Sequence, residues 1–359
     1  MRYPDFLKKN GTIGFVAPAF GCAIEPYKSG FGGAKQCFGD MGYKISEGPN
    51  CSQNSGIGIS NTPEKCGEEL NSFYADPSTD ILISCGGGEL MCEVVPYIDF
   101  DLIASSRPKW FMGYSDNTNF TFLSATLADT AAIYGPCAAA FGMKPWHKSL
   151  HDAMSLLTGE SCHDKTISLK GYDSWEIESM KTEESPFEPY NTTEKSRIIC
   201  LPDGYLTEYT EDKPISVGDI TMSGRLLGGC LDCLEHLIGT KYDKVSDFSE
   251  KYTSEGILWF LEACDLGPMD VRRTIWHMRQ AGWFDNAKGF LIGRPYRYAE
   301  EMMGVDMYNA VVDIISDLNL PIILDADVGH HPPMLPLICG SMASIATNGN
   351  DYSVSMRLV

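Results

Sequence analysis

Short apolar runs that end in glycine or proline alternate, in the first part of the chain, with segments whose composition suits helices. The clearest runs are GTIGFVAP at residues 11–18, TDILISCGGG at 79–88 and KWFMG at 109–113. Runs of this length are typical of buried strands. Strands that alternate with helices predict a mostly parallel sheet, whose ligand site lies at the carboxyl ends of the strands. We therefore expect the loops after the three runs to converge.

A second set of strand-like and helix-like segments follows a polar stretch. The sequence KGYDSWEIESMKTEESPFEPYNTTEKSR is charged, contains proline and is poor in aliphatic residues, which is typical of a linker or a long surface loop. Beyond it, SGRLLGGCLDCLEHLIGT predicts a glycine-marked turn leading into a helix, and VRRTIWHMRQAG predicts a further helix. EGILWFLEACD, KGFLIGRP and LPIILDAD predict strands.

These patterns predict an α/β protein with two domains. We expect an N-terminal parallel-sheet domain over residues 1–145 and a C-terminal mixed α/β domain over residues 200–359. A linker with an inserted loop is expected between them, over residues 146–199. A chain of 359 residues with 43% hydrophobic content can bury two such cores.

The charge of the chain limits its partners. Lys and Arg number 28 and Asp and Glu number 48, so the formal net charge is 28 − 48 = −20. This charge repels nucleic-acid phosphates and anionic lipid surfaces. No apolar stretch is long enough to span a membrane, and the first residues resemble a strand more than a secretory signal. We expect a cytoplasmic protein that binds neither nucleic acid nor membranes.

The cysteines favour a reducing compartment. They number 13, without regular spacing, in a chain too large to need a disulfide framework. The one close pair, Cys230 and Cys233, has the spacing of half a metal site or of a redox motif, but no second pair follows it. We interpret the two residues as buried thiols on one helix, and we predict no metal site.

Ser115 is the first candidate for chemistry. It lies in GYSDNTN at residues 113–119, directly after an apolar run and before residues that cap helices well. A strand-to-helix turn of this kind is the geometry of a nucleophile elbow, in which the N–H of the next residue, Asp116, can stabilise an oxyanion. The glycines of CGGGE at residues 85–89 could supply a second N–H donor, since no Cβ hinders a ligand there. The alternatives are a simple helix cap and a tight turn.

A serine nucleophile needs a base within hydrogen-bond reach and a group that orients this base. His330 and His331 follow a strand and a glycine and precede two prolines, in a rigid loop. We favour His330, although chemistry alone does not separate the two. For the orienting acid we favour Glu262, which closes the apolar run ILWFLE and needs a partner there. A structural ion pair with Arg272 or Arg273 is the alternative.

Four segments in order resemble the LD-carboxypeptidase family, and more closely its MccF-like branch. PKWFMGYSDNT is similar to the family's strand and nucleophile turn, and SGRLLGGCLDCLEHLIGT to the segment that opens its second domain. LEACD is similar to the strand with the catalytic glutamate, and VGHHPPMLPLICG to the Gly-His loop. The similarity spans residues 11–345, and the expected N-terminal domain is of the class I glutamine amidotransferase type.

The resemblance implies a serine peptidase in which Ser115 is the nucleophile, His330 the general base and Glu262 the residue that orients it. The active site would then lie between the two domains. The family's oxyanion hole corresponds to Gly87 or Gly88 and the N–H of Asp116. The resemblance implies no metal or organic cofactor. It does imply a homodimer.

Family members cleave amide bonds near a free carboxyl terminus. The murein branch removes a terminal D-alanine from an L,D-linked tetrapeptide, and the MccF branch cuts a peptide–nucleotide conjugate or an aminoacyl adenylate. The long insert around residues 170–215 favours the second branch. We therefore expect a small peptide or a peptidyl- or aminoacyl-nucleotide as substrate.

Glu89, Trp175 and Arg225 are the candidate substrate contacts. Murein enzymes usually have Arg-Gly-Gly-Tyr-Gly where this chain has CGGGE, so that Glu89 places an acidic group near the oxyanion loop. Trp175, Phe187 and Tyr190 of the insert could stack on a nucleobase or only anchor the loop.

Two other functions stay open: a cysteine hydrolase that uses Cys85, and a binding protein without activity.

Overall fold

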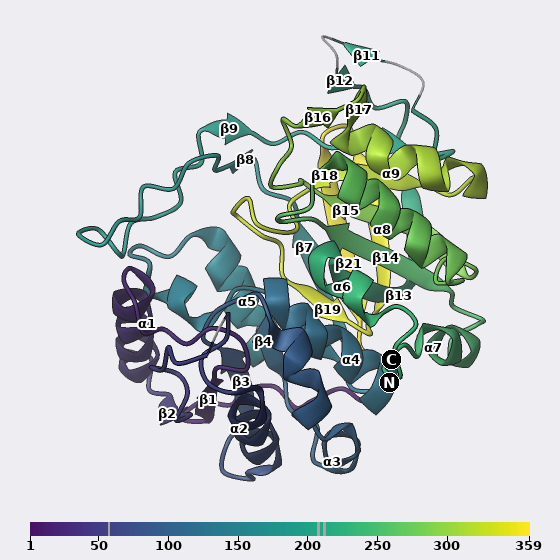
Figure 1. The fold of residues 1–359 in the computed structure, drawn as a ribbon. Helices are drawn as coiled ribbons and strands as arrows, with labels where there is room; N and C mark the ends of the chain where they lie inside the picture. Colours follow the sequence, from purple (N-terminus) through teal and green to yellow (C-terminus); the bar gives the residue numbers. More distant parts are fainter. Residues whose placement is uncertain (57, 207–208, 211–212) are drawn as a thin grey trace. The chain divides into compact units, whose positions relative to one another are not determined.

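The computed structural model describes residues 1–56, 58–206, 209–210 and 213–359 (Figure 1). The chain forms two compact units, each built around a β-sheet of its own. Unit 1 comprises Met1–His163, Glu178–Asn191 and Pro336–Gly340. Unit 2 comprises Asp164–Ile177, Thr192–Leu335 and Ser341–Val359.

The sheet of unit 1 has the strand order β19-β5-β4-β3-β1-β2. Neighbouring strands are parallel except β5 and β19, which are antiparallel. The strand order reverses between β1 and β3, and ligands bind at the carboxyl ends of parallel strands beside such a switch point. The strands are β1 (Thr12–Val16), β2 (Lys44–Glu47), β3 (Ile81–Ser84), β4 (Phe111–Gly113), β5 (Ala132–Tyr134) and β19 (Leu337–Cys339).

The helices of unit 1 begin and end at residues that satisfy the free backbone groups of helix ends. Helix α2 follows Thr62, whose hydroxyl accepts a hydrogen bond from the N–H of Lys65, and α5 ends at Gly159 with a left-handed φ of 71°. The helical segments are α1 (Tyr27–Asp40), α2 (Pro63–Ala75), η1 (Met91–Glu93), η2 (Val95–Tyr97), α3 (Phe100–Ser105), η3 (Ser115–Asn117), α4 (Thr118–Ala128), η4 (Ala138–Gly142) and α5 (Lys148–Thr158).

The central strands of unit 1 are buried along their length. Every residue of β3 and of β4 is buried, as expected for parallel strands covered by helices on both faces. Leu82 and Phe111 pack in one apolar cluster with Phe120 of α4, and the two phenylalanine rings are 4.5 Å apart. This core fixes the strand ends from which the glycine loop and the Ser115 turn depart.

The second sheet is mixed, with the strand order β10-β18-β15-β14-β13-β20-β21-β7-β6, and all of its strands except β6 belong to unit 2. The neighbours β13, β14, β15 and β18 are parallel, and the outer pairs are antiparallel. These strands are β7 (Thr166–Lys170), β10 (Ile199–Leu201), β13 (Thr221–Cys230), β14 (Ile257–Glu262), β15 (Ala287–Gly293), β18 (Ile322–Ala326), β20 (Met342–Asn348) and β21 (Asp351–Arg357). The short strands are β6 (Cys162–His163), β8 (Ser174–Trp175), β9 (Glu194–Lys195), β11 (Tyr209–Thr210), β12 (Lys213–Pro214), β16 (Glu301–Met302) and β17 (Val305–Asp306).

Helices cover one face of the parallel strands of unit 2. In Figure 1, α6, α8 and α9 lie over the same face of β13, β14 and β15. Helix α9 follows Asp306, whose carboxylate accepts a hydrogen bond from the N–H of Asn309. The helical segments are α6 (Leu231–Leu237), α7 (Val245–Lys251), α8 (Pro268–Gln280), α9 (Met307–Ile315) and η5 (Ser316–Leu318).

The predicted fold class is confirmed, with a parallel sheet near the N-terminus and a separate mixed α/β unit. The runs predicted as strands contain β1, β3 and β4 in the first half and β14, β15 and β18 in the second. The glycine-marked turn was wrong, because SGRLLGGC forms most of β13. A Cβ on Gly228 would lie 1.7 Å from the carbonyl oxygen of Phe260 on β14, so glycine serves the close approach of two strands rather than a turn.

The described residues contain no helix that combines the length and the apolar character needed to cross a membrane.

All 13 cysteines are free. Cys230 ends β13 and Cys233 lies in α6, both buried. Within the described part of the chain, no group of three or more His, Cys, Asp or Glu side chains is placed to hold a metal ion.

Candidate active site

Ser115 lies in a strained turn directly after β4. Its φ angle is 62°, in the left-handed region that non-glycine residues seldom adopt. The hydroxyl of Tyr134, on the neighbouring strand β5, accepts a hydrogen bond of 3.1 Å from the N–H of Ser115. A serine held at positive φ between a strand and a helix is the backbone geometry of a nucleophile elbow.

The residues after Ser115 hold this turn rather than cap a helix. The side-chain amide of Asn117 donates hydrogen bonds to the carbonyl oxygens of Gly86, at 2.8 Å, and Tyr114, at 3.0 Å. Asn117 therefore ties the serine turn to the glycine loop. It is the residue before α4, as expected for a residue that caps helices well, but its side chain makes no capping hydrogen bond. The carboxylate of Asp116 accepts a hydrogen bond of 2.8 Å from the N–H of Met91.

The glycine loop after β3 passes close to Ser115. A Cβ on Gly87 would lie 3.1 Å from the Cβ of Ser115 and 3.2 Å from its hydroxyl oxygen. A Cβ on Gly88 would lie 3.0 Å from the carboxylate of Asp116. The carbonyl oxygen of Gly87 also accepts a hydrogen bond of 2.7 Å from the N–H of Phe20, in the loop after β1. The loops after β1, β3 and β4 thus converge, as the sequence predicted.

Glu262 and His330 form a buried pair in unit 2. Glu262 is the last residue of β14, is 1% exposed, and follows a strand whose every residue is buried. Nδ1 of His330 lies 2.9 Å from Oε2 of Glu262. Because an ionised carboxylate only accepts hydrogen bonds, the proton of this bond belongs to Nδ1. The pair therefore fixes the orientation and the tautomer of the imidazole.

Glycine before His330 makes this pair possible. Gly329 has a φ of 112°, and a Cβ on it would lie 2.7 Å from Oε2 of Glu262. The loop can approach the end of β14 only because no side chain stands between them.

The surroundings of His330 favour its charged form. Burial is the strongest influence and lowers its pKa, but the carboxylate of Glu262 and hydrogen bonds with Cys264 and Glu262 act in the opposite direction and prevail. The pKa of His330 is therefore raised well above the usual value for an imidazole.

The alternative residues considered for the base and for the ion pair make other contacts. Nδ1 of His331 faces the carbonyl oxygen of Glu176 at 3.1 Å, and Nε2 faces that of Tyr296 at 3.0 Å, so this ring ties two loops together. Arg272 pairs with Asp313 at 2.7 Å and Arg273 with Asp270 at 2.6 Å, so neither is the ion-pair partner of Glu262.

The candidate substrate contacts lie in different places. Glu89 is exposed and follows the glycine loop of unit 1. Trp175 lies in unit 2, where its ring centroid is 4.8 Å from that of His331 and 4.5 Å from the guanidinium carbon of Arg294. Sequence reasoning missed Arg294, which is 4% exposed and packs on the tryptophan, because nothing near it in the sequence marks it.

Arg225, the third candidate substrate contact, lies near the start of β14 in unit 2. Arg225 pairs in register with Ile257 at the start of β14, whereas Glu262 stands at the other end of that strand. Its guanidinium is 2% exposed, forms an ion pair with Glu255 and lies 4.1 Å from the ring centroid of Tyr252. These contacts hold the guanidinium in place within unit 2, and its role in substrate binding stays a prediction.

The other aromatic residues of the insert have packing partners in unit 1. The ammonium of Lys144 lies 5.2 Å from the ring centroid of Phe187, and the ring of Tyr190 is 5.5 Å from that of His147.

Cys85, the alternative nucleophile, is fully buried at the end of β3, and burial raises its pKa well above the usual value for a thiol. A thiol in this state is a poor nucleophile.

Two family models match the chain. The N-terminal domain model of the LD-carboxypeptidases matches residues 13–135, which include the glycine loop and the Ser115 turn. The C-terminal domain model of the same family matches residues 223–345, which include Glu262 and His330. Together the two models span more than half of the sequence.

Curated relatives match over nearly the whole chain. A Vibrio cholerae protein whose name assigns it to the carboxypeptidases is 24% identical over 374 residues, covering 100% of this chain and 99% of its own. The microcin C7 self-immunity protein MccF of Escherichia coli is 22% identical over 349 residues, covering 96% and 93%. A protein of Bacillus subtilis named as a probable murein peptide carboxypeptidase is 22% identical over 347 residues, covering 96% and 91%.

Solved structures of similar proteins share the fold. An MccF-like protein from Bacillus anthracis aligns with a TM-score of 0.80 and 21% identity, covering 100% of both chains. MccF in complex with glutamyl sulfamoyl guanosine aligns with a TM-score of 0.79 and 19% identity, covering 99% of this chain and 98% of MccF.

Proposed function

The chain belongs to the LD-carboxypeptidase family and is a serine carboxypeptidase-type hydrolase. From this premise we propose that Ser115, His330 and Glu262 form its catalytic triad. The observation that carries the proposal is the buried hydrogen bond of 2.9 Å between His330 and Glu262. It presents an oriented imidazole, and such an imidazole is what a serine nucleophile needs as its base. The positive φ of Ser115 supports the same assignment from unit 1.

In the proposed mechanism His330 takes the proton of Ser115 while the serine oxygen attacks the amide carbonyl carbon. The N–H groups of Gly87 or Gly88 and of Asp116 stabilise the resulting oxyanion. His330 then gives its proton to the leaving amine as the C–N bond breaks, which leaves an acyl group on Ser115. A water molecule, deprotonated by His330, attacks this acyl group and releases a carboxylate and the free serine.

We propose that the substrate is an aminoacyl- or peptidyl-nucleotide, or a related small peptide conjugate. The similarity to MccF supports this class, since solved MccF structures contain glutamyl sulfamoyl guanosine and aspartyl sulfamoyl adenosine. The alternative is a murein tetrapeptide, which is supported by the similarity to the Bacillus subtilis relative. The homodimer and the cytoplasmic location stay predictions.

The choice of substrate can be tested with the full chain and two compounds. We expect hydrolysis of aspartyl sulfamoyl adenosine, seen by mass spectrometry as free aspartate and sulfamoyl adenosine. Release of D-alanine from a murein L,D-tetrapeptide, without turnover of the nucleotide analogue, would transfer the assignment to the murein alternative. Turnover of neither compound would rule out both of these substrates.

Replacing Gly87 by alanine is expected to slow hydrolysis about 100- to 1,000-fold through kcat, the range seen when one oxyanion donor is lost. The added methyl group would lie 3.2 Å from the hydroxyl oxygen of Ser115, where it crowds the oxyanion site. The matched control is Gly32→Ala in α1, where an added Cβ meets no atom within 4 Å. Equal steady-state rates for the two variants would contradict a role of Gly87 in the site.

A further inference from the structure

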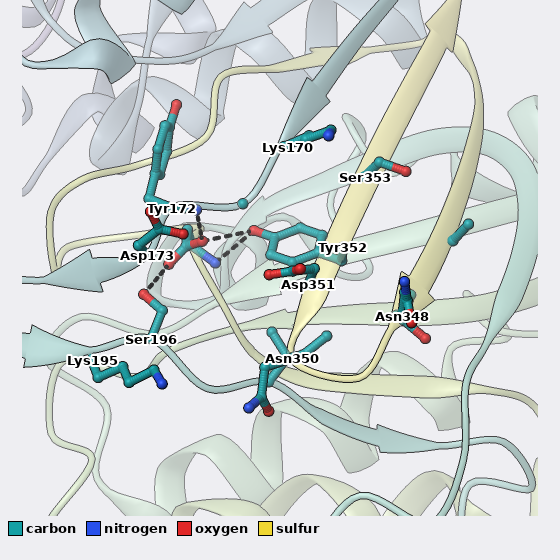
Figure 2. A pocket seen from close by; sticks show the side chains of 15 residues that line it. Lys170, Tyr172, Asp173, Lys195, Ser196, Asn348, Asn350, Asp351, Tyr352 and Ser353 are labelled. Atoms are coloured by element: carbon teal, nitrogen blue, oxygen red, sulfur yellow. Dashed lines mark hydrogen bonds between the residues drawn. The ribbon is translucent and has the colours of Figure 1, made fainter.

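Unit 2 contains a cavity that shares no residue with the proposed triad. It has a volume of about 720 Å³ and lies between the end of β7, the segment after β9 and the tip of the β20–β21 hairpin (Figure 2). Cavities of roughly 300–1,000 Å³ are typical of small-molecule sites. Glu262 and His330 do not line it, so the cavity is formed without the triad residues of unit 2.

The rim of this cavity carries two positive and two negative groups. Lys170 and Lys195 lie at opposite edges, and Asp173 and Asp351 contribute carboxylates (Figure 2). All four residues are exposed, and within the described part of the chain none of these four side chains forms an ion pair. The rim therefore offers separate sites for an anion and for a cation, with a net charge of zero.

The floor of the cavity is a buried, fully bonded carboxylate. Asp327 is 1% exposed and pairs with Arg294 at 3.3 Å, so its charge is balanced. It also accepts hydrogen bonds from the N–H of Tyr172 at 2.9 Å, the hydroxyl of Tyr352 at 3.3 Å and the hydroxyl of Ser196 at 3.5 Å. These bonds hold the floor in place without adding net charge, so recognition is left to the rim.

The uncharged polar groups of the wall suit amide bonds. Asn348 and Asn350 line the cavity from the hairpin tip, and their side chains can both donate and accept hydrogen bonds. The hydroxyl of Thr347 also lines it but already accepts a hydrogen bond of 2.7 Å from the N–H of Ile220. A nucleotide phosphate fits less well than a zwitterion, because it has no positive group to offset the repulsion from the two carboxylates of the rim. The described residues also offer no cluster of ligands for a metal ion.

We propose that this cavity binds a small zwitterion with a free carboxylate and a free ammonium group, namely an amino acid or a short peptide. The carboxylate is held by one of the two lysines, Lys170 or Lys195, the ammonium by Asp173 or Asp351, and the peptide amides by the hairpin side chains. The site is independent of the triad, so it can be present whether or not Ser115 is the nucleophile.

Isothermal titration calorimetry of triglycine tests this proposal. The protein is the full-length Ser115→Ala variant, which by the proposed mechanism would not consume the peptide. We expect saturable binding that weakens at least tenfold in Kd when Lys170→Ala and Lys195→Ala are added, and likewise with Asp173→Asn and Asp351→Asn. Triglycinamide and N-acetyltriglycine, which each lack one charge, are expected to bind at least tenfold more weakly than triglycine. Hydrogen exchange should show protection by triglycine in residues 168–173 and 346–353.

The matched control is Lys28→Ala, an exposed lysine of α1, which should leave the Kd unchanged. Absence of triglycine binding would overturn the proposal, as would binding that none of the four rim substitutions weakens. Competition by inorganic phosphate as strong as that by triglycine would also overturn it, in favour of a simple anion site. Failure of the proposed hydrolysis would be seen separately, in the turnover assay with wild-type protein.

Discussion

Replacing Ser115 by alanine is expected to lower kcat for the nucleotide analogue by about 10⁴- to 10⁶-fold, the loss seen when a catalytic serine is removed from a triad. The reason is that alanine has no hydroxyl oxygen to attack the amide carbonyl carbon. The residual rate would come from the oxyanion donors and from binding alone. Steady-state kinetics, with the products followed by mass spectrometry, measure this loss.

The strain at Ser115 gives this prediction a second readout. A non-glycine residue in the left-handed region costs roughly 1–2 kcal/mol, and glycine avoids most of this cost. Ser115→Gly should therefore be as inactive as Ser115→Ala but more stable to urea by about 1 kcal/mol. The control is Ser105→Ala in α3, an exposed serine, which should keep full activity. Activity close to the wild-type rate in Ser115→Ala would assign the reaction to another nucleophile.

The strands of both units could be predicted because burial on two faces leaves uninterrupted apolar runs in the sequence. Ser115 and Glu262 could be found for the same reason, since each stands where such a run ends. The glycine pair of β13 could not be interpreted correctly. Two adjacent glycines are compatible with a turn and with a close approach of strands, and the carbonyl of Phe260, which decides between them, comes from a different strand.

Residues whose role depends on distant partners escaped the sequence patterns. Asn117 looks like a helix cap, but its amide bonds the carbonyl oxygen of Gly86, from the loop after another strand. The ion pair of Arg225 with Glu255 and its register beside Ile257 could not be predicted either, since both depend on how β13 and β14 pair. The choice between His330 and His331 likewise depends on which ring meets the carboxylate, and no spacing in the sequence determines that.

Replacing Glu262 by glutamine is expected to lower kcat/KM by about 10³- to 10⁴-fold, as for the orienting acid of other triads. A glutamine amide can present its NH₂ group to Nδ1 of His330, which favours the tautomer with the proton on Nε2. In that tautomer Nε2 cannot accept the proton of a serine hydroxyl. The variant keeps the shape of the side chain, so the loss would reflect the hydrogen bond and the charge rather than a cavity.

The pH dependence of the same variant distinguishes catalysis from structure. His330 must be neutral to act as a base, and its pKa is raised, so wild-type kcat/KM should rise with pH and level off well above the usual imidazole pKa of about 6.5. In Glu262→Gln the carboxylate is gone and burial dominates, so the acid limb should move to lower pH. Glu250→Gln, an exposed position in α7, is the matched control and should leave rate and profile unchanged. A wild-type rate in Glu262→Gln, or an acid limb that does not move, would mean that the pair at 2.9 Å is structural and that His330 is not the base.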